Sequence, residues 1–156
     1  MNISILPGIL LLAELLILSI AAVPTAIAEI WGSAIVKEDA TLRVRGHRVR
    51  LFGIHIPSIN RFCGSAVYPV SCEAQSASRV LNSKIRGSVH CYERWQNADG
   101  SFTAICWNED NDLGAYLIGR GWALATPDAP FEYHALEKVA RYQRRGFWAY
   151  YGYDVY

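Results

Sequence analysis

The chain has 156 residues, 52% of them hydrophobic, and carries 15 basic against 14 acidic side chains. Five Trp, nine Tyr and five Phe residues can supply a sizeable core, which excludes an intrinsically disordered chain. The near-neutral charge lacks the strongly basic composition that marks many nucleic-acid-binding domains. The length fits one domain.

The first 28 residues differ in kind from the rest. Residues 5–23 are almost wholly apolar, and the A-I-A tripeptide at 26–28 has the pattern of a signal-peptide cleavage site. The sequence predicts a signal peptide over 1–28 and an exported domain, secreted or periplasmic, over 29–156. An uncleaved membrane anchor is the alternative. Two details fit the signal peptide poorly: no Lys or Arg precedes the apolar run, and Glu14 lies inside it, where a carboxylate is also costly for a spanning helix. After cleavage no stable membrane span is expected.

Alternating apolar and polar residues predict the first strands of the domain. A strand is expected over 34–36, followed by a hairpin over 41–51 with its two-residue turn at Gly46-His47. Pro57 is expected to end the last of these strands. The inward-facing side chains of this hairpin are predicted to be Leu42, Val44, Val49 and Leu51.

The second half of the domain mixes helices with a further hairpin. The predicted elements are a helix over 73–85, a hairpin over 89–107, a short helix over 113–118 and a longer helix over 132–145. The apolar face of the last helix is expected to contain Tyr133, Leu136, Val139 and Ala140. Residues 147–151 are expected to pack against the core. The predicted fold is α+β and mainly β, an OB-fold five-stranded Greek-key barrel with three helices.

Four cysteines in an exported domain favour two disulfide bonds. Cys91 and Cys106 are equidistant from the turn at 97–100, so they are expected to face each other across the second hairpin. Cys63 and Cys72 would then close a short loop. A zinc site and free thiols are the alternatives, although zinc favours paired cysteine or histidine spacings that the sequence lacks.

Aromatic side chains recur in the second hairpin as Tyr92, Trp95 and Trp107. Alternating aromatics in a barrel usually belong to the core, and these three are predicted to be buried. The alternative is an exposed set that stacks on bases or sugar rings.

Four co-linear segments, found at 38–58, 72–77, 112–123 and 133–148, resemble the thermonuclease (staphylococcal-nuclease-like) family. The first reads EDATLRV and then VRLFGIHIPS, where the family has D-G-D-T-L-x-V and then V-R-L-x-G-I-D-x-P-E. The others read CEAQSA, DLGAYLIGRGWA and YHALEKVARYQRRGFW. The resemblance is to exported members with paired cysteines, and it implies an OB barrel.

The resemblance also places the family's functional positions on this chain. The two calcium-binding aspartates are replaced by Ala40 and His55, and the glutamate that positions water is replaced by Ser58. The first phosphate-clamping arginine is retained as Arg50, whereas Ser101 stands at the second. Because four of these five positions are altered, calcium-dependent nuclease activity and a calcium cofactor are not expected.

Two other arrangements of these residues would preserve chemistry. Glu38 or Asp39 would hold a relocated metal, although a one-residue shift along a strand turns a side chain to the other face. His55 with Ser58 and Arg50 would form a new acid–base site, but Ser58 has no identified group to orient it.

A cluster of arginines marks the first hairpin. Arg43, Arg45 and Arg48 join Arg50 as candidate ligand-binding residues, with a solvated face as the alternative. The leading hypothesis is a catalytically impaired domain that binds nucleic acid, an anionic polysaccharide or a protein partner. An active phosphodiesterase with a rearranged site and an accessory role in exopolysaccharide production are the alternatives.

Overall fold

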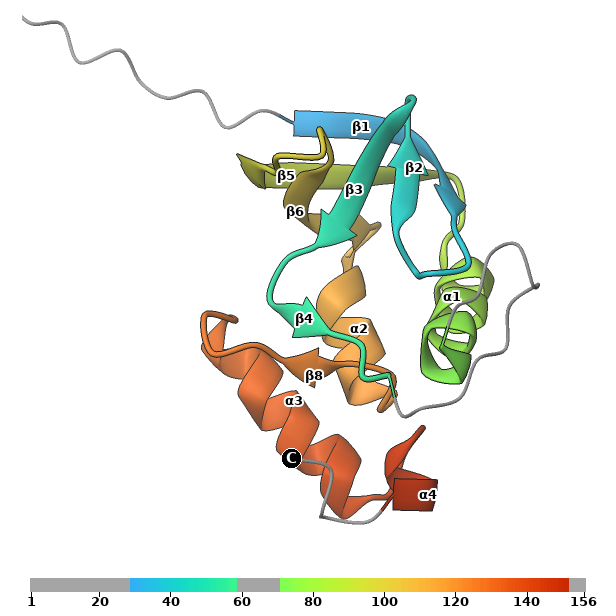
Figure 1. Cartoon of the computed structure of the whole chain (residues 1–156), viewed down its shortest axis with the longest axis vertical. Coiled ribbons are helices and arrows are strands. Elements are labelled where there is room, and N and C mark those ends of the chain that lie inside the picture. The colour runs from blue at the N-terminus through green and yellow to red at the C-terminus, as the bar shows by residue number, and fades with distance from the viewer. Residues whose placement is uncertain (1–28, 59–70, 152–156) are drawn as a thin grey trace, which may run out of the picture.

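The computed structural model of the chain describes residues 29–58 and 71–151 (Figure 1). The predicted signal peptide over 1–28 lies outside these residues. No described helix is long and apolar enough to cross a membrane.

Five strands form the central barrel. They are β1 (Glu29–Val36), β2 (Leu42–Val44), β3 (His47–Leu51), β5 (Ser88–Gln96) and β6 (Phe102–Asn108). Their order is β3-β2-β1-β5-β6, and a parallel pairing of β3 with β6 closes the barrel. This closed, mixed barrel with helices confirms the predicted fold class, and its connectivity is compatible with an OB fold.

The last strand of the first hairpin does not continue to Pro57 as predicted, because β3 ends at Leu51 and a turn at Phe52 and Gly53 separates it from a further short strand. Two other short strands were not predicted at all. β4 (Ile54–His55) pairs with β8 (Leu124–Ala125), and β7 (Asn111–Asp112) extends the barrel sheet beside β6. The β4–β8 ladder joins the chain after the first hairpin to the segment before the helix α3 (Phe131–Tyr142), as Figure 1 shows.

Three helices and one further turn of helix accompany the barrel in the described part of the chain. They are α1 (Cys72–Lys84), α2 (Leu113–Gly119), α3 (Phe131–Tyr142) and the four-residue α4 (Trp148–Tyr151). The three predicted helices are confirmed, but α3 ends three residues before the predicted end at 145. The left-handed φ of 51° at Arg144 is incompatible with a helix that continues through it.

The buried face of α3 also differs from the prediction. Its buried residues are Tyr133, Glu137 and Ala140, and Leu136 is partly buried. Val139 is exposed, which makes its prediction wrong. The side chains that face the core follow an i, i+4, i+7 spacing from Tyr133. Val139 is one residue before Ala140 in the sequence, so its side chain points about 100° away around the helix axis.

The first hairpin turns one residue earlier than predicted. Val44 pairs with His47, so the turn consists of Arg45 and Gly46, whose φ angles are 49° and 89°. Two positive φ angles are what a two-residue hairpin turn of type I′ requires, and Gly46 adopts one at no steric cost. The predicted inward face of this hairpin is confirmed, because Leu42, Val44, Val49 and Leu51 are all buried.

The second hairpin matches its prediction closely. Cys91 lies opposite Cys106 in the β5–β6 ladder, and the two form a disulfide bond inside the barrel. Such bonds persist in oxidising compartments, which agrees with an extracytoplasmic location. The predicted Cys63–Cys72 bond involves Cys63, which lies outside the described residues.

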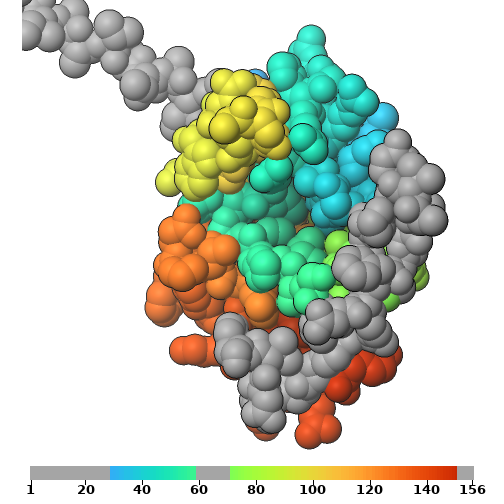
Figure 2. All heavy atoms as spheres, in the orientation of Figure 1, coloured from blue at the N-terminus to red at the C-terminus, as the bar shows by residue number. Residues whose placement is uncertain are grey.

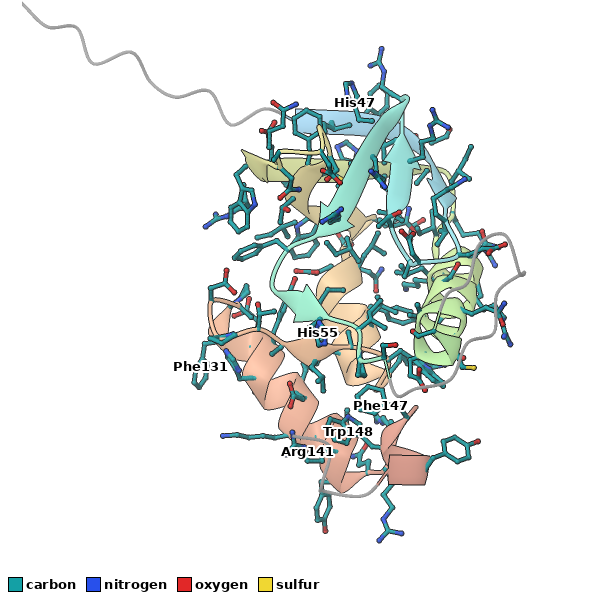
Figure 3. The ribbon with its side chains drawn as sticks, viewed as in Figure 1. His47, His55, Phe131, Arg141, Phe147 and Trp148 are labelled. Atoms are coloured by element: carbon teal, nitrogen blue, oxygen red, sulfur yellow. A yellow bond between two sulfur atoms is a disulfide. The ribbon has the colours of Figure 1, made fainter. Side chains whose placement is uncertain are left out.

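A second, smaller core lies below the barrel. Phe147 and Trp148 pack with Leu124 and Ala140, as predicted for the first part of 147–151. Tyr150, by contrast, is exposed. Figure 3 shows Arg141 of α3 beside Trp148, with the guanidinium 4.4 Å from the ring centroid.

Candidate functional site

The retained arginine lies in an ion-paired cluster between two hairpins. Arg50 of β3 donates a 2.7 Å hydrogen bond to Oδ2 of Asp99, and Arg48 donates a 3.2 Å hydrogen bond to the same oxygen. Asp99 belongs to the β5–β6 turn, which Figure 2 shows in yellow beside the β2–β3 hairpin. All three side chains are between one third and about one half exposed, so the cluster is open to solvent.

Asp99 is held in place by its own turn. Its Oδ1 accepts hydrogen bonds from the Ser101 hydroxyl at 2.6 Å and from the Ser101 backbone N–H at 3.1 Å. These bonds, and then the charges of Arg50 and Arg48, lower the pKa of Asp99 below its ordinary value. The carboxylate is therefore ionised at neutral pH and offsets part of the arginine charge.

Ser101 has a structural part in the same turn. It is only 1% exposed, and its hydroxyl accepts a 3.0 Å hydrogen bond from Asn97. Asn97 also bonds Thr103 on β6. The position at which the resemblance expects a second arginine thus carries a small buried side chain that orients Asp99.

The remaining altered positions do not join this cluster through any contact described here. Ala40 is buried in the β1–β2 turn at a φ of 61°. The neighbouring Asp39 accepts hydrogen bonds from the Thr41 backbone N–H at 3.0 Å and hydroxyl at 2.6 Å. That carboxylate stabilises the turn, which leaves it poorly placed as a relocated metal ligand.

His55 and Ser58 lie beyond the barrel strands. His55 is an exposed residue of β4 that pairs with Leu124, and Ser58 is exposed at the end of the first described segment. Figure 3 shows His55 well away from His47, which marks the tip of the first hairpin. Nothing in the described geometry joins His55 and Ser58 to Arg50 as an acid–base site.

The donor set does not fit calcium. Ala40 has no ligand atom, and His55 offers a nitrogen where calcium prefers six to eight oxygens. Within residues 29–58 and 71–151, no group of three or more His, Cys, Asp or Glu side chains is arranged to hold a metal ion.

The other arginines of the first hairpin lie beside the cluster. Arg43 of β2 is directly opposite Arg48 in the ladder. The stem of Arg45 lies against β1, where a Cβ on Gly32 would come 2.7 Å from its Cγ. Neither Arg43 nor Arg45 has an ion-pair partner among the described residues. We call Arg43, Arg45, Arg48 and Arg50 the basic face.

Asp99 is the residue of this candidate site that the sequence did not reveal. Its Asp-Gly-Ser context indicates a turn, and the turn was predicted. Its contact with Arg50 spans 49 residues, however, and no local pattern encodes it. The signal that could have found it is the parallel β3–β6 pairing that closes the barrel and brings Arg50 beside Thr103.

The aromatic residues of the second hairpin correct another prediction. Tyr92, Trp95 and Trp107 are exposed on the outside of the barrel and are not core residues. The inward positions of the two strands are taken by Cys91 and Cys106, which alternate with the aromatics. The alternation was recognised correctly, but it was assigned to the wrong face.

No protein-family model and no curated protein matches the chain. What the structure defines is therefore a class of fold, a disulfide-bonded mixed barrel of five strands with helices.

Proposed function

We propose that the chain is an exported thermonuclease-like domain that has lost calcium-dependent catalysis and binds an anionic ligand through its basic face. The observation that carries the proposal is the imbalance of charge on this face. Four arginines lie on two adjacent strands and their turn, and only Asp99 pairs with any of them among the described residues.

The ladder itself favours an added anion. Like charges directly opposite each other destabilise a strand pair, and Arg43 faces Arg48. An anion between the two guanidinium groups would relieve this repulsion. Guanidinium forks also match the oxygen geometry of phosphates and carboxylates, which makes arginine the side chain best suited to such ligands.

The altered positions support a loss of catalysis. A metal that stabilises developing charge usually supplies much of the rate of phosphoryl transfer. Ala40 and His55 offer a poor calcium site, Ser58 is no general base without a partner, and Asp39 is engaged by Thr41.

The ligand is proposed to be a nucleic acid or an anionic polysaccharide, with an acidic protein partner as a further possibility. OB barrels bind extended chains of both kinds, and each kind carries the repeated negative charge that the basic face complements. Asp99 occupies part of this face, so a ligand anion must bind beside it or compete with it for Arg48 and Arg50.

Binding can be tested with the oxidised protein purified after export of the full chain. Fluorescence anisotropy with a labelled single-stranded oligonucleotide and with alginate oligosaccharide would compare the two ligand classes. The proposal expects salt-sensitive binding that weakens in Arg43→Gln/Arg48→Gln and persists in the control Arg79→Gln, which changes an arginine of α1. Binding equal in all three proteins would contradict it.

Catalysis can be tested on the same preparation. We expect no cleavage of single-stranded or double-stranded DNA above background, either with calcium or with a chelator. Calcium-dependent cleavage that Arg50→Ala abolishes would instead support the alternative, an active phosphodiesterase with a rearranged site.

A further inference from the structure

A row of aromatic side chains crosses the outside of the barrel on β1, β5 and β6. Trp31 of β1 pairs with His90 of β5, which pairs in turn with Trp107 of β6. Tyr92 is the next outward residue of β5. Because β1, β5 and β6 are consecutive strands of the sheet (Figure 1), the four rings form one surface.

These rings are more exposed than large aromatic side chains usually are. Trp31 is 51% exposed, Tyr92 43% and Trp107 36%. The rings of Trp31 and His90 lie 5.8 Å apart with a tilt of 38°. Single exposed apolar residues are common, but a contiguous set rimmed by polar groups is typical of an interaction site.

A hollow of about 420 Å³ lies on this surface. His90, Tyr92, Trp107, Glu109 and Asp110 line it, so no Lys or Arg side chain is part of its wall. Glu109 and Asp110 have no ion-pair partner among the described residues. We call these five residues the acidic aromatic hollow.

Further details add to its negative character. Oε1 of Glu29 lies 2.8 Å from Nδ1 of His90, which adds a carboxylate at the edge of the hollow. Glu109 and Asp110 form the two-residue turn between β6 and β7. Glu109 adopts a φ of 53° there, a conformation in which Gly or Asn is less strained.

We infer that the acidic aromatic hollow binds an arginine- or lysine-bearing segment of a partner protein. Ring faces attract cations, most strongly in Trp and Tyr, and nearby carboxylates attract the same groups. The aromatic rings and the carboxylates of the hollow therefore both favour a positively charged ligand. The same carboxylates repel phosphates and acidic sugars, which separates this site from the basic face.

The competing occupants are less complementary. A neutral sugar would stack on Tyr92 and Trp107 but would gain nothing from the net charge of Glu109 and Asp110. A second copy of the chain would have to place its basic face in the hollow, and such a head-to-tail contact builds open chains unless it closes into a ring.

The test is fluorescence anisotropy of a labelled, capped oligoarginine peptide titrated with the oxidised, exported protein at low and high salt. The inference expects binding that weakens with salt. Trp107→Thr should weaken it about twofold to fivefold. Glu109→Gln/Asp110→Asn should weaken it roughly threefold to tenfold. Circular dichroism should show that both variants remain folded.

Matched controls define the outcomes that overturn the inference. Trp95→Thr removes an aromatic of β5 that packs against Phe52 outside the hollow, and Glu132→Gln removes a carboxylate of α3. Neither control should alter binding. Equal losses in the control and hollow variants would contradict the inference. Binding of a neutral chito-oligosaccharide in preference to the peptide would also contradict it. So would self-association in sedimentation experiments that Trp107→Thr abolishes.

Discussion

The basic face and the acidic aromatic hollow are built on one barrel but have opposite chemistry. On β2 and β3, the outward positions hold arginines, and one carboxylate, Asp99, pairs with two of them. On β1, β5 and β6, the outward positions hold aromatic rings, with Glu109 and Asp110 beside them and no ion-pair partner described for either. The inward positions of the five strands are mostly apolar and supply much of the main core, although the buried Asn108 of β6 is an exception. The comparison indicates that the inward side chains determine the barrel, whereas the outward side chains can differ in charge and chemistry from one face to the other.

The two regions share one structural support, the β5–β6 hairpin. It carries the Asp99 turn at one end and leads into the Glu109 turn at the other. We expect Cys91→Ala/Cys106→Ala to reduce the free energy of unfolding by about 3 kcal/mol, because the bond spans 15 residues and restricts the unfolded chain. Denaturant titration of both proteins would measure this. Equal stability would show that the hairpin does not depend on the bond.

Tyr133 of α3 tests whether contacts from the helices stabilise the acidic aromatic hollow and leave the basic face unaffected. Its hydroxyl donates a hydrogen bond to Asp112 at 2.8 Å, and Asp112, the last residue of β7, caps α2 two residues after the Glu109-Asp110 turn. Tyr133→Phe should cost about 1.5–3 kcal/mol, the usual value for a hydrogen bond to a charged group. Peptide binding at the hollow should weaken more than anion binding at the basic face. Tyr150→Phe, at an exposed position, is the control and should change neither stability nor binding.

The same tyrosine predicts an alkaline limit of stability. Burial, and then the Asp112 carboxylate, raise the pKa of Tyr133 above its ordinary value of 10.0. The folded protein therefore keeps a proton that the unfolded chain releases, so its stability falls as the pH rises above 10. This decline should be shallower in Tyr133→Phe. Parallel denaturation curves at alkaline pH, with equal declines in both proteins, would contradict the assignment.

Removal of the Asp99 carboxylate would make the basic face more positive and so increase its difference in charge from the acidic aromatic hollow. Asp99→Asn frees Arg48 and Arg50, and it should tighten anion binding about threefold to tenfold, since two exposed ion pairs no longer compete. Glu38→Gln, which changes an exposed carboxylate elsewhere, should leave binding almost unchanged. Weaker binding by Asp99→Asn would mean that Asp99 orders the arginines for the ligand and does not compete with it.

Protonation of Asp99 in acid should remove its contribution to the stability of the fold, as the Asp99→Asn substitution does. Its folded pKa is lower than its unfolded value. The hydrogen bonds from Ser101 and, after them, the ion pairs with Arg50 and Arg48 therefore stabilise the fold above pH 3.8, and this contribution is lost as the pH falls below that value. The difference in stability between the native protein and Asp99→Asn should therefore shrink in acid. Thermal melts across the acid range would follow it.

Substitution of Glu109 gives the smallest expected change in stability, and it should change stability and peptide binding in opposite directions. Glu109→Gly relieves a left-handed backbone and should raise the free energy of unfolding by about 1 kcal/mol. It also removes a carboxylate of the hollow, so oligoarginine binding should weaken. A variant that is both less stable and unchanged in binding would contradict this role.

What the sequence predicted well was local. Cys91 and Cys106 lie symmetrically about a recognisable turn, so their pairing followed from counting residues. The hairpins and helices followed from their periodicity. The same periodicity could not say which face of β5 and β6 points inward, so Tyr92 and Trp107 were assigned to the core.

What the sequence could not supply was long-range. β4 and β8 have two residues each and pair across some 70 residues of chain, as Ile54 with Ala125 shows. The Arg50–Asp99 contact likewise depends on closure of the barrel. The candidate site could therefore be predicted as a set of arginines, but not as a cluster with a competing carboxylate.

The measurement that tests the proposed division of labour most directly is an amide and indole NMR titration of the exported protein with a single-stranded oligonucleotide. We predict shifts at the amides of Arg48, Arg50, Asp99 and Ser101, with no change at the Trp107 indole. Shifts centred on Trp107, or none at the basic face with either this probe or alginate oligosaccharide, would contradict an anion-binding site on the first hairpin.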